Sequence, residues 1–100
     1  MMTAINIFSG GQSQLREVAA AIESEILPTL RKQHGFRGSR LYRRCDGIEL
    51  VQCTDWESLA DHDASSDSAE LAMVGMRLAD LLDSGEIEMY VDAYEIAASA

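Results

Sequence analysis

Five side chains of this 100-residue chain are candidates for chemistry: Asn6, Gln52, Trp56, His62 and Arg77. The two amides can donate and accept hydrogen bonds at the same time, and the indole N–H can donate into a cavity. The imidazole of His62 can take a phenolic proton, while the guanidinium of Arg77 can neutralise an oxygen anion. Side chains of these types suit the binding and deprotonation of a small hydroxylated ligand.

Each candidate could also have a purely structural role, and the residue types alone do not decide between the two roles. A strand amide can bond to neighbouring backbone, a strand tryptophan is most often a core anchor, and Arg77 can pair with Asp80 on the same helix. The carboxylates of Asp61 and Asp63 would favour the charged form of His62, which weakens it as a base. We expect no metal site here, because ligands two residues apart rarely converge on a helix.

The pattern of apolar residues predicts the elements that must position these side chains. Residues 3–8 are β-branched and aromatic and predict a first strand. Apolar residues at spacings of three and four, from Leu15 to Leu30, predict a long helix. Pro28 should kink or loosen its last turns, and Gly35 should help to end it.

A hairpin is predicted next, because two strand-like runs flank Asp46 and Gly47. An Asp-Gly pair in this setting favours a type I′ turn with a two-residue loop. The resulting register places Leu41 opposite Gln52. Trp56 then shares one face of the second hairpin strand with Gln52, since their spacing is even.

The second half of the chain predicts one more helix and one more strand. Asp67 and Glu70 resemble a capping box in front of an amphipathic helix that runs from Leu71 to Gly85. Residues 86–96 alternate between apolar and polar types and predict a strand. The order β-α-β-β-α-β is that of the α+β ferredoxin-like fold, with an antiparallel sheet and both helices on one face.

The predicted sheet also indicates a partner. Five strand side chains are too many for both faces to be wet: Ile5, Ile7, Ile87, Met89 and Val91. Since the helices cover one face only, we expect a homodimer packed sheet to sheet.

Charge is unevenly distributed along the chain. Six of the eight Lys and Arg residues lie within residues 31–44, although the formal net charge is -9. In the ferredoxin-like strand order the basic second strand and the acidic last strand form opposite edges. We expect the basic edge of one copy to approach the acidic edge of another, because like edges would repel.

Composition excludes several classes of protein. The negative net charge argues against binding to nucleic acid or to an anionic membrane, and no apolar run reaches the roughly 20 residues of a membrane helix. Cys45 and Cys53 point to opposite faces of the predicted hairpin, so no disulfide is expected. We expect a cytoplasmic protein, because the first residues do not read as a secretory signal. We also expect one domain over residues 1–100, because 100 residues is the usual length of a single domain.

Several short motifs resemble the antibiotic biosynthesis monooxygenase (ABM) family. They are the Gly-Phe of residues 35–36, the Leu-Tyr-Arg of residues 41–43, the Asp-Trp-Glu-Ser of residues 55–58 and the following His62. The likeness extends over about residues 3–96. It implies a dimeric α+β barrel built from ferredoxin-like subunits.

The resemblance also implies roles for individual residues. Members that oxidise polyketides use a strand amide, a tryptophan and an arginine on the last helix, which implies such roles for Gln52, Trp56 and Arg77. Gln52 stands where asparagine is usual. Heme-degrading members use an asparagine on the first strand, as Asn6 would be, but no histidine follows ten residues after His62. Heme degradation is therefore disfavoured.

The function that the resemblance implies is a monooxygenase without a cofactor, which oxidises a polycyclic phenolic or polyketide-type, anthrone-like substrate with O₂. The expected partners are this small aromatic substrate, O₂ and a second copy of the chain. Two alternatives remain open: a ligand-binding dimer without catalysis, and a polyketide cyclase or isomerase on the same barrel.

Overall fold

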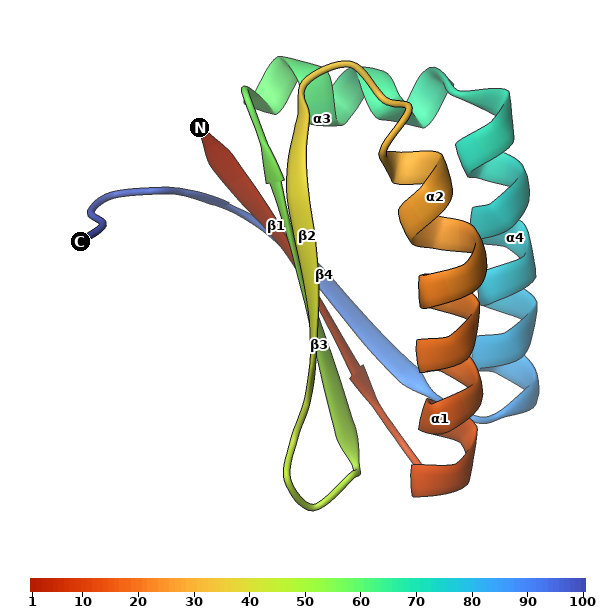
Figure 1. The fold of residues 1–100 in the computed structure, drawn as a ribbon. Helices are drawn as coiled ribbons and strands as arrows, with labels where there is room; N and C mark the ends of the chain where they lie inside the picture. The colour runs from red at the N-terminus through yellow and green to blue at the C-terminus, as the bar shows by residue number, and fades with distance from the viewer.

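A four-stranded sheet with helices on one side makes up the fold (Figure 1). The structure is a computed structural model that describes residues 1–100. Its elements, in chain order, are β1 (Met2–Ser9), α1 (Gln12–Ala21), a π-helical segment (Ile22–Ile26), α2 (Leu27–Leu30), β2 (Phe36–Arg43), β3 (Glu49–Trp56), α3 (Leu59–Ala64), a 3₁₀ turn (Ser65–Asp67), α4 (Ala69–Ser84) and β4 (Glu88–Glu95).

The strands are arranged in the order β2-β3-β1-β4, and every neighbouring pair is antiparallel. Helices α1, α2 and α4 lie on the same side of this sheet, and α3 runs across one end of it (Figure 1). The ferredoxin-like α+β fold predicted from the sequence is therefore confirmed. Because β2 and β4 are the two edges, the basic and acidic strands lie as far apart as the sheet allows.

Alternate side chains of the central strands point toward the helices and form the core. Phe8 and Leu50 are completely buried there, together with Val18 and Ile22 of the first helix. Burial of one such side chain stabilises a fold by about 1.5–3 kcal/mol. The core comprises 13 buried apolar side chains: Met2, Ala4, Phe8, Leu15, Val18, Ile22, Ile26, Leu30, Leu50, Trp56, Val74, Leu82 and Ile87.

The first helix loosens ahead of Pro28, as the sequence predicted. A proline has no N–H to donate, so it cannot bond to the carbonyl of Ser24 four residues earlier. The helix adopts a π-helical winding over Ile22–Ile26 and resumes as α2. Gly35 follows with a φ of 79°, and a side chain there would collide with Asp61.

The β2–β3 hairpin has the predicted register but not the predicted turn. Leu41 pairs with Gln52, and Arg44 N–H bonds to the carbonyl of Glu49. A type I′ turn would need a positive φ at both Asp46 and Gly47, yet only Gly47 has one. The loop is longer because Gly47 N–H closes a turn on Arg44 and the Asp46 carboxylate accepts the N–H of Ile48.

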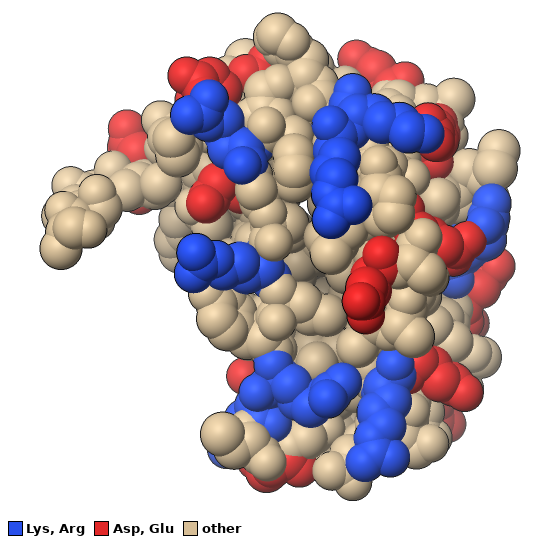
Figure 2. All heavy atoms as spheres, viewed as in Figure 1, with Lys and Arg blue, Asp and Glu red and all other residues tan.

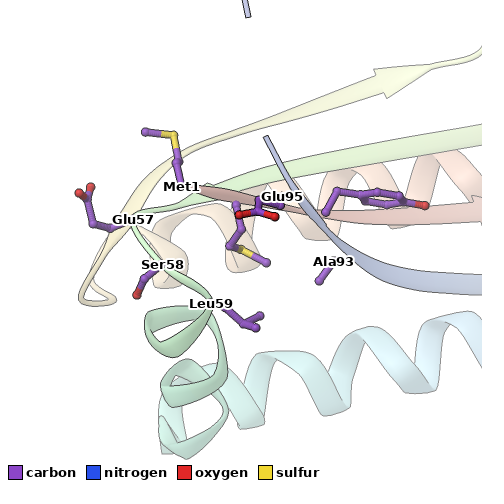
Figure 3. A pocket seen from close by; sticks show the side chains of 8 residues that line it. Met1, Glu57, Ser58, Leu59, Ala93 and Glu95 are labelled. Atoms are coloured by element: carbon purple, nitrogen blue, oxygen red, sulfur yellow. The ribbon is translucent and has the colours of Figure 1, made fainter. Parts of the chain in front are cut away.

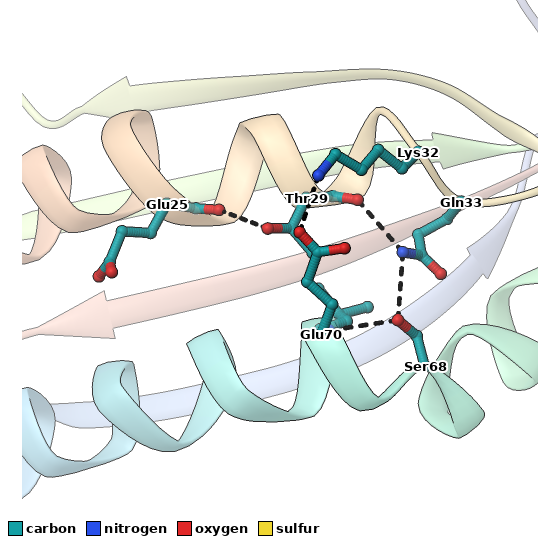
Figure 4. A network of polar contacts seen from close by, with 7 residues as sticks. Glu25, Thr29, Lys32, Gln33, Ser68 and Glu70 are labelled. Atoms are coloured by element: carbon teal, nitrogen blue, oxygen red, sulfur yellow. Dashed lines mark hydrogen bonds and ion pairs between the residues drawn. The ribbon is translucent and has the colours of Figure 1, made fainter.

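Helix α4 begins one residue later than the capping box predicted. Its N-cap is Ser68, whose hydroxyl accepts the N–H of Leu71. Ser68 also accepts a hydrogen bond from Gln33, and Lys32 pairs with Glu70 at 2.8 Å (Figure 4). These contacts fasten the end of α2 to the start of α4.

One face of the sheet has no helices over it. We name it the open face; its apolar and aromatic side chains are Ile5, Ile7, Tyr42, Val51, Tyr90 and Tyr94. The expected set of five differs in detail, because Ile87 is buried in the core just before β4. Met89 and Val91 belong to the helix side but are 45% and 57% exposed.

The β2 edge carries the basic residues that the sequence placed there, and Lys and Arg side chains lie along this side of the molecule (Figure 2). Two of the arginines already have partners within the chain: Arg37 pairs with Glu57 at 3.3 Å and Arg44 with Asp46 at 3.0 Å. Arg40 has no carboxylate partner and points to the open face, opposite Cys53. No helix of the chain has the length and apolar character needed to cross a membrane.

Candidate functional site

A cavity of about 250 Å³ lies between the helix side of the sheet and helices α2 and α4. Four of the five candidates from the sequence line it: Asn6, Gln52, Trp56 and His62. They come from β1, β3 and α3, so the fold brings together residues far apart in the sequence. The other lining residues are Ala4, Ile26, Leu30, Thr54, Ser65, Leu71, Gly75, Leu78 and Val91.

A row of polar side chains crosses the sheet beneath this cavity. Asn6 and Gln52 are directly paired between β1 and β3, and Asn6 Nδ2 donates to Gln52 Oε1 at 3.4 Å. Gln52 Nε2 donates to the Ser39 hydroxyl at 3.2 Å, and that hydroxyl lies 2.9 Å from Thr54 Oγ1. Because Gln52 is only 2% exposed, these hydrogen bonds satisfy a buried amide.

The row also fixes how Asn6 meets a ligand. One N–H of Asn6 is occupied by Gln52, whereas its carbonyl oxygen accepts no hydrogen bond from the protein. That oxygen and the second N–H are available in the cavity. The longer side chain of Gln52 thus serves to bridge Asn6 and Ser39.

Trp56 is a core anchor that also forms a wall of the cavity. Its ring is 2% exposed and meets Phe36 and His62 edge to face, with ring centroids 6.0 Å and 5.8 Å away. The indole N–H has no acceptor within the protein, and the chain leaves no sealed polar side-chain atom without a partner. The N–H therefore keeps some accessible surface, and the candidate cavity is the one that Trp56 lines.

His62 lies at the mouth of the cavity, with 31% of its side chain exposed. Its Nδ1 is 3.1 Å from a carboxylate oxygen of Asp63. A proton on Nδ1, shared with Asp63, leaves Nε2 as the basic nitrogen. Asp61 does not share this role, because its carboxylate contacts Ser58 at 3.0 Å and His34 at 3.6 Å.

Arg77 is the candidate that the structure places elsewhere. It is on α4 but does not line the cavity, and its guanidinium pairs with Glu25 of the π-helical segment. Position 77 is two residues beyond Gly75, about 200° around the helix from the cavity side. The partner is thus Glu25 on the neighbouring helix rather than Asp80.

Sequence reasoning missed several residues of the site. Ser39 and Thr54 lie opposite each other in the predicted hairpin register, so that register was the signal that could have found them. Gly75 was also missed, although a glycine inside a helical pattern is itself unusual. Ser65 could not be found this way, because it sits in the turn between α3 and α4.

A second, larger cavity of about 510 Å³ lies where the ends of β1 and β4 meet the start of α3 (Figure 3). Its polar side chains are Glu57, Ser58, Tyr94 and Glu95, and the hydroxyl of Ser58 already donates to Asp61. It contains no amide, histidine or arginine side chain that could hold an oxygen anion. The cavity of about 250 Å³ is the candidate site, because it brings together four of the five residues that the sequence singled out.

The smaller cavity has the properties needed to deprotonate and hold an aromatic ligand. Its walls are mostly apolar, which strengthens the hydrogen bonds that a ligand makes inside it. Asn6 offers a carbonyl oxygen and an N–H, Trp56 offers an N–H, and His62 offers a basic nitrogen. A phenol that gives its proton to His62 would find donors for the resulting anion.

Comparison with solved structures shows the same fold in ABM-type proteins. A candidate antibiotic biosynthesis monooxygenase from Deinococcus radiodurans has a TM-score of 0.79 at 14% identity, over 100% of this chain and 95% of that one. A protein from Mycobacterium tuberculosis has a TM-score of 0.77 at 23% identity, over 99% and 97%. SnoaB from Streptomyces nogalater, a cofactor-independent oxygenase, has a TM-score of 0.73 at 16% identity, over 98% and 94%.

No protein-family model matches the chain, and no curated protein matches its sequence. The matches to solved structures confirm, at the level of the fold, the resemblance to the ABM family that the sequence motifs indicated. The likeness spans nearly the whole of each chain, so the candidate cavity lies within the shared architecture.

Proposed function

We propose that this protein is a cofactor-independent monooxygenase that oxidises an electron-rich, polycyclic phenol of the polyketide type with O₂. One observation carries the proposal: Asn6, Gln52, Trp56 and His62 meet at a single, mostly apolar cavity. The fold shared with SnoaB, a cofactor-independent oxygenase, supports the same reaction class.

In this proposal, His62 accepts the phenolic proton at Nε2 while Asp63 holds the ring by Nδ1. The phenolate oxygen then accepts the indole N–H of Trp56 and the free N–H of Asn6. Gln52 positions Asn6 through their hydrogen bond and does not need to touch the ligand. Stabilised as an anion, the ligand becomes able to pass an electron to O₂.

The electron balance needs O₂ alone as oxidant. The phenolate gives one electron to O₂, and the resulting superoxide and ligand radical combine at a ring CH₂ or CH carbon to form a peroxide anion. This anion takes back the proton held by His62 and becomes a hydroperoxide. Loss of water then breaks the O–O bond and leaves a carbonyl. One oxygen atom remains in the product, and the other leaves as water. The substrate supplies the two electrons that each oxygen atom requires.

Oxygen uptake tests this proposal directly. With anthrone as the substrate, we expect uptake of one O₂ and no release of H₂O₂ for each molecule of anthraquinone. Hydroquinone and 1,4-dihydroxynaphthalene can become quinones by losing two hydrogens to O₂, which yields H₂O₂, so with these two substrates only a product that has gained an oxygen atom counts as monooxygenation. Asn6→Ala, Trp56→Phe and His62→Gln should each lower kcat/KM by about 10–1,000-fold. His34→Gln is the matched control, because His34 is 95% exposed and contacts only Asp61.

Two results would contradict the oxygenase. Uptake no faster than the uncatalysed rate with all three substrates would be one, and equal rates for all the cavity variants would be the other. A change of the ligand without oxygen uptake would instead point to a cyclase or isomerase, and binding without change to a ligand-binding protein.

We also propose that the protein is a homodimer packed through its open face. Ile7 lies at the centre of this face, between Val51 and Tyr90, and Tyr90 is 63% exposed. A face of this kind would bury apolar area in a dimer, for which about 800 Å² per partner is usual. Arg40, which has no carboxylate partner in its own chain, would approach acidic residues such as Asp92 of the second copy.

Sedimentation velocity tests the dimer. Ile7→Lys should give a folded monomer, since it places a charge in the middle of the interface. Ile48→Lys is the control, because Ile48 is 49% exposed in the hairpin loop and away from the open face. Reversal of Arg40, Arg43 and Arg44 to Glu should also weaken the dimer. A dimer unchanged by Ile7→Lys would contradict this packing.

A further inference from the structure

Gly75 lies in the middle of α4 and lines the candidate cavity. A Cβ atom placed on it would have no heavy atom within 4 Å, so the residue faces open space. Leu71 and Leu78, one turn away on either side, line the same cavity. Position 75 is thus a gap in an otherwise apolar helix face.

The protein does not need a glycine at this position for its own structure. Gly35 and Gly47 have a φ of 79°, and side chains on them would collide with neighbouring residues. Gly75 has an ordinary helical backbone and no neighbour to avoid. Alanine would fit there and would favour the helix, because glycine is the poorer helix former.

Space is what the glycine provides. The cavity of about 250 Å³ is smaller than the roughly 300–1,000 Å³ that is usual for drug-sized ligands. Any side chain at position 75 would project from α4 into this limited volume. Across the cavity lie the amides of Asn6 and Gln52 on the sheet, which is where the polar atoms of a ligand would bind.

We propose that Gly75 sets the size limit of the ligand, and that a flat, fused-ring phenol lies between Gly75 and the Asn6–Gln52 pair. This inference rests on the proposed ligand site and narrows its substrate class. The ring plane packs against the bare backbone of α4, and the hydroxyl meets Asn6.

Binding without turnover provides the test. Trp56 is the chain's single tryptophan and lines the cavity, so quenching of its fluorescence reports on the ligand. Titrations under anaerobic conditions use hydroquinone, 1,4-dihydroxynaphthalene and anthrone as probes. The wild-type protein should bind all three probes, and anthrone, which has three fused rings, should lose most affinity when bulk is added at position 75.

The variants should shift this ring-size preference. Gly75→Ala should weaken the two-ring probe about tenfold and the one-ring probe by less, while its melting temperature rises by about 2–6 °C. Gly75→Leu should prevent binding of both. Ala20→Leu is the control for added bulk, because Ala20 is exposed on α1 and does not line the cavity. Ala20→Gly is the control for helix propensity.

The outcomes separate this inference from the proposed function. If the wild type binds the probes and Gly75→Ala and Gly75→Leu bind all of them equally well, Gly75 does not limit the ligand and the inference is wrong. If the wild type binds none of the probes and consumes no oxygen, the proposed ligand site fails as well. Because Gly75→Ala is expected to be more stable than the wild type, loss of folding cannot explain its weaker binding.

Discussion

Removal of the Arg77 charge distinguishes the catalytic role that the family resemblance implied from the structural role that the fold gives it. In the structure, Arg77 pairs with Glu25, and the two side chains are 56% and 34% exposed. Ion pairs this accessible to solvent stabilise a fold by about 0–1 kcal/mol. We therefore expect Arg77→Gln to reduce the free energy of unfolding by about 0.5 kcal/mol, which lowers the melting temperature by roughly 2–4 °C.

The assay is thermal unfolding of Arg77→Gln, Glu25→Gln and the double variant, followed by circular dichroism. The two single variants should lose similar stability, and the double variant should lose no more than either, because they remove the same pair. The difference from the wild type should fade at 1 M salt, where charges are screened beyond about 3 Å.

Ligand binding supplies the result that would refute this reasoning. A hydrogen bond from arginine to a phenolate inside the cavity would contribute about 1.5–3 kcal/mol, or roughly 10–150-fold in affinity. Binding of the phenol probes should change less than about twofold in both single variants. A loss of tenfold or more in Arg77→Gln but not in Glu25→Gln would mean that Arg77 reaches the ligand.

Two further predictions test local features of the fold. Glu86 follows α4 with a φ of 54°, and there its N–H bonds to the carbonyl of Asp83 while the N–H of Ile87 bonds to that of Leu82. Glycine adopts this backbone without strain, so Glu86→Gly should raise the free energy of unfolding by about 1 kcal/mol in urea titrations. No gain in stability would contradict the strained backbone. Partial burial raises the pKa of the Cys53 thiol, whereas Cys45 is exposed in the hairpin loop. At pH 8 iodoacetamide should therefore alkylate Cys45 first, which mass spectrometry of the peptides measures. Faster reaction at Cys53 would contradict its placement.

Much of the fold followed from local patterns. Alternation on the strands placed Gln52 and Trp56 on one face, and the hairpin register paired Leu41 with Gln52, as the structure confirms. Period-two alternation and Gly-containing turns are properties of neighbouring residues, so they can be read without knowing the rest of the chain. The details that failed, such as the type of the Asp46–Gly47 turn and the N-cap at Ser68, depend on competition between near-equal local hydrogen bonds.

The candidate site was predictable only in part. Residue type and family resemblance indicated Asn6, Gln52, Trp56 and His62, but neither could say whether these residues meet. That depends on β1 pairing with β3, which sets Asn6 against Gln52 across 46 positions of sequence. Helix periodicity did not determine the partner of Arg77, and only the packing of α4 beside the first helix gave it Glu25 as a partner.

The sequence by itself thus determined the order and type of the elements, because hydrophobic periodicity expresses which side of each element must be buried. Tertiary structure alone decided which polar groups share the cavity and how large the cavity is. The bridge from Asn6 through Gln52 to Ser39 joins three strands, and the open space at Gly75 lies among side chains from the sheet, α2 and α4. Distances between elements arise from packing of the whole chain, so no local pattern encodes them.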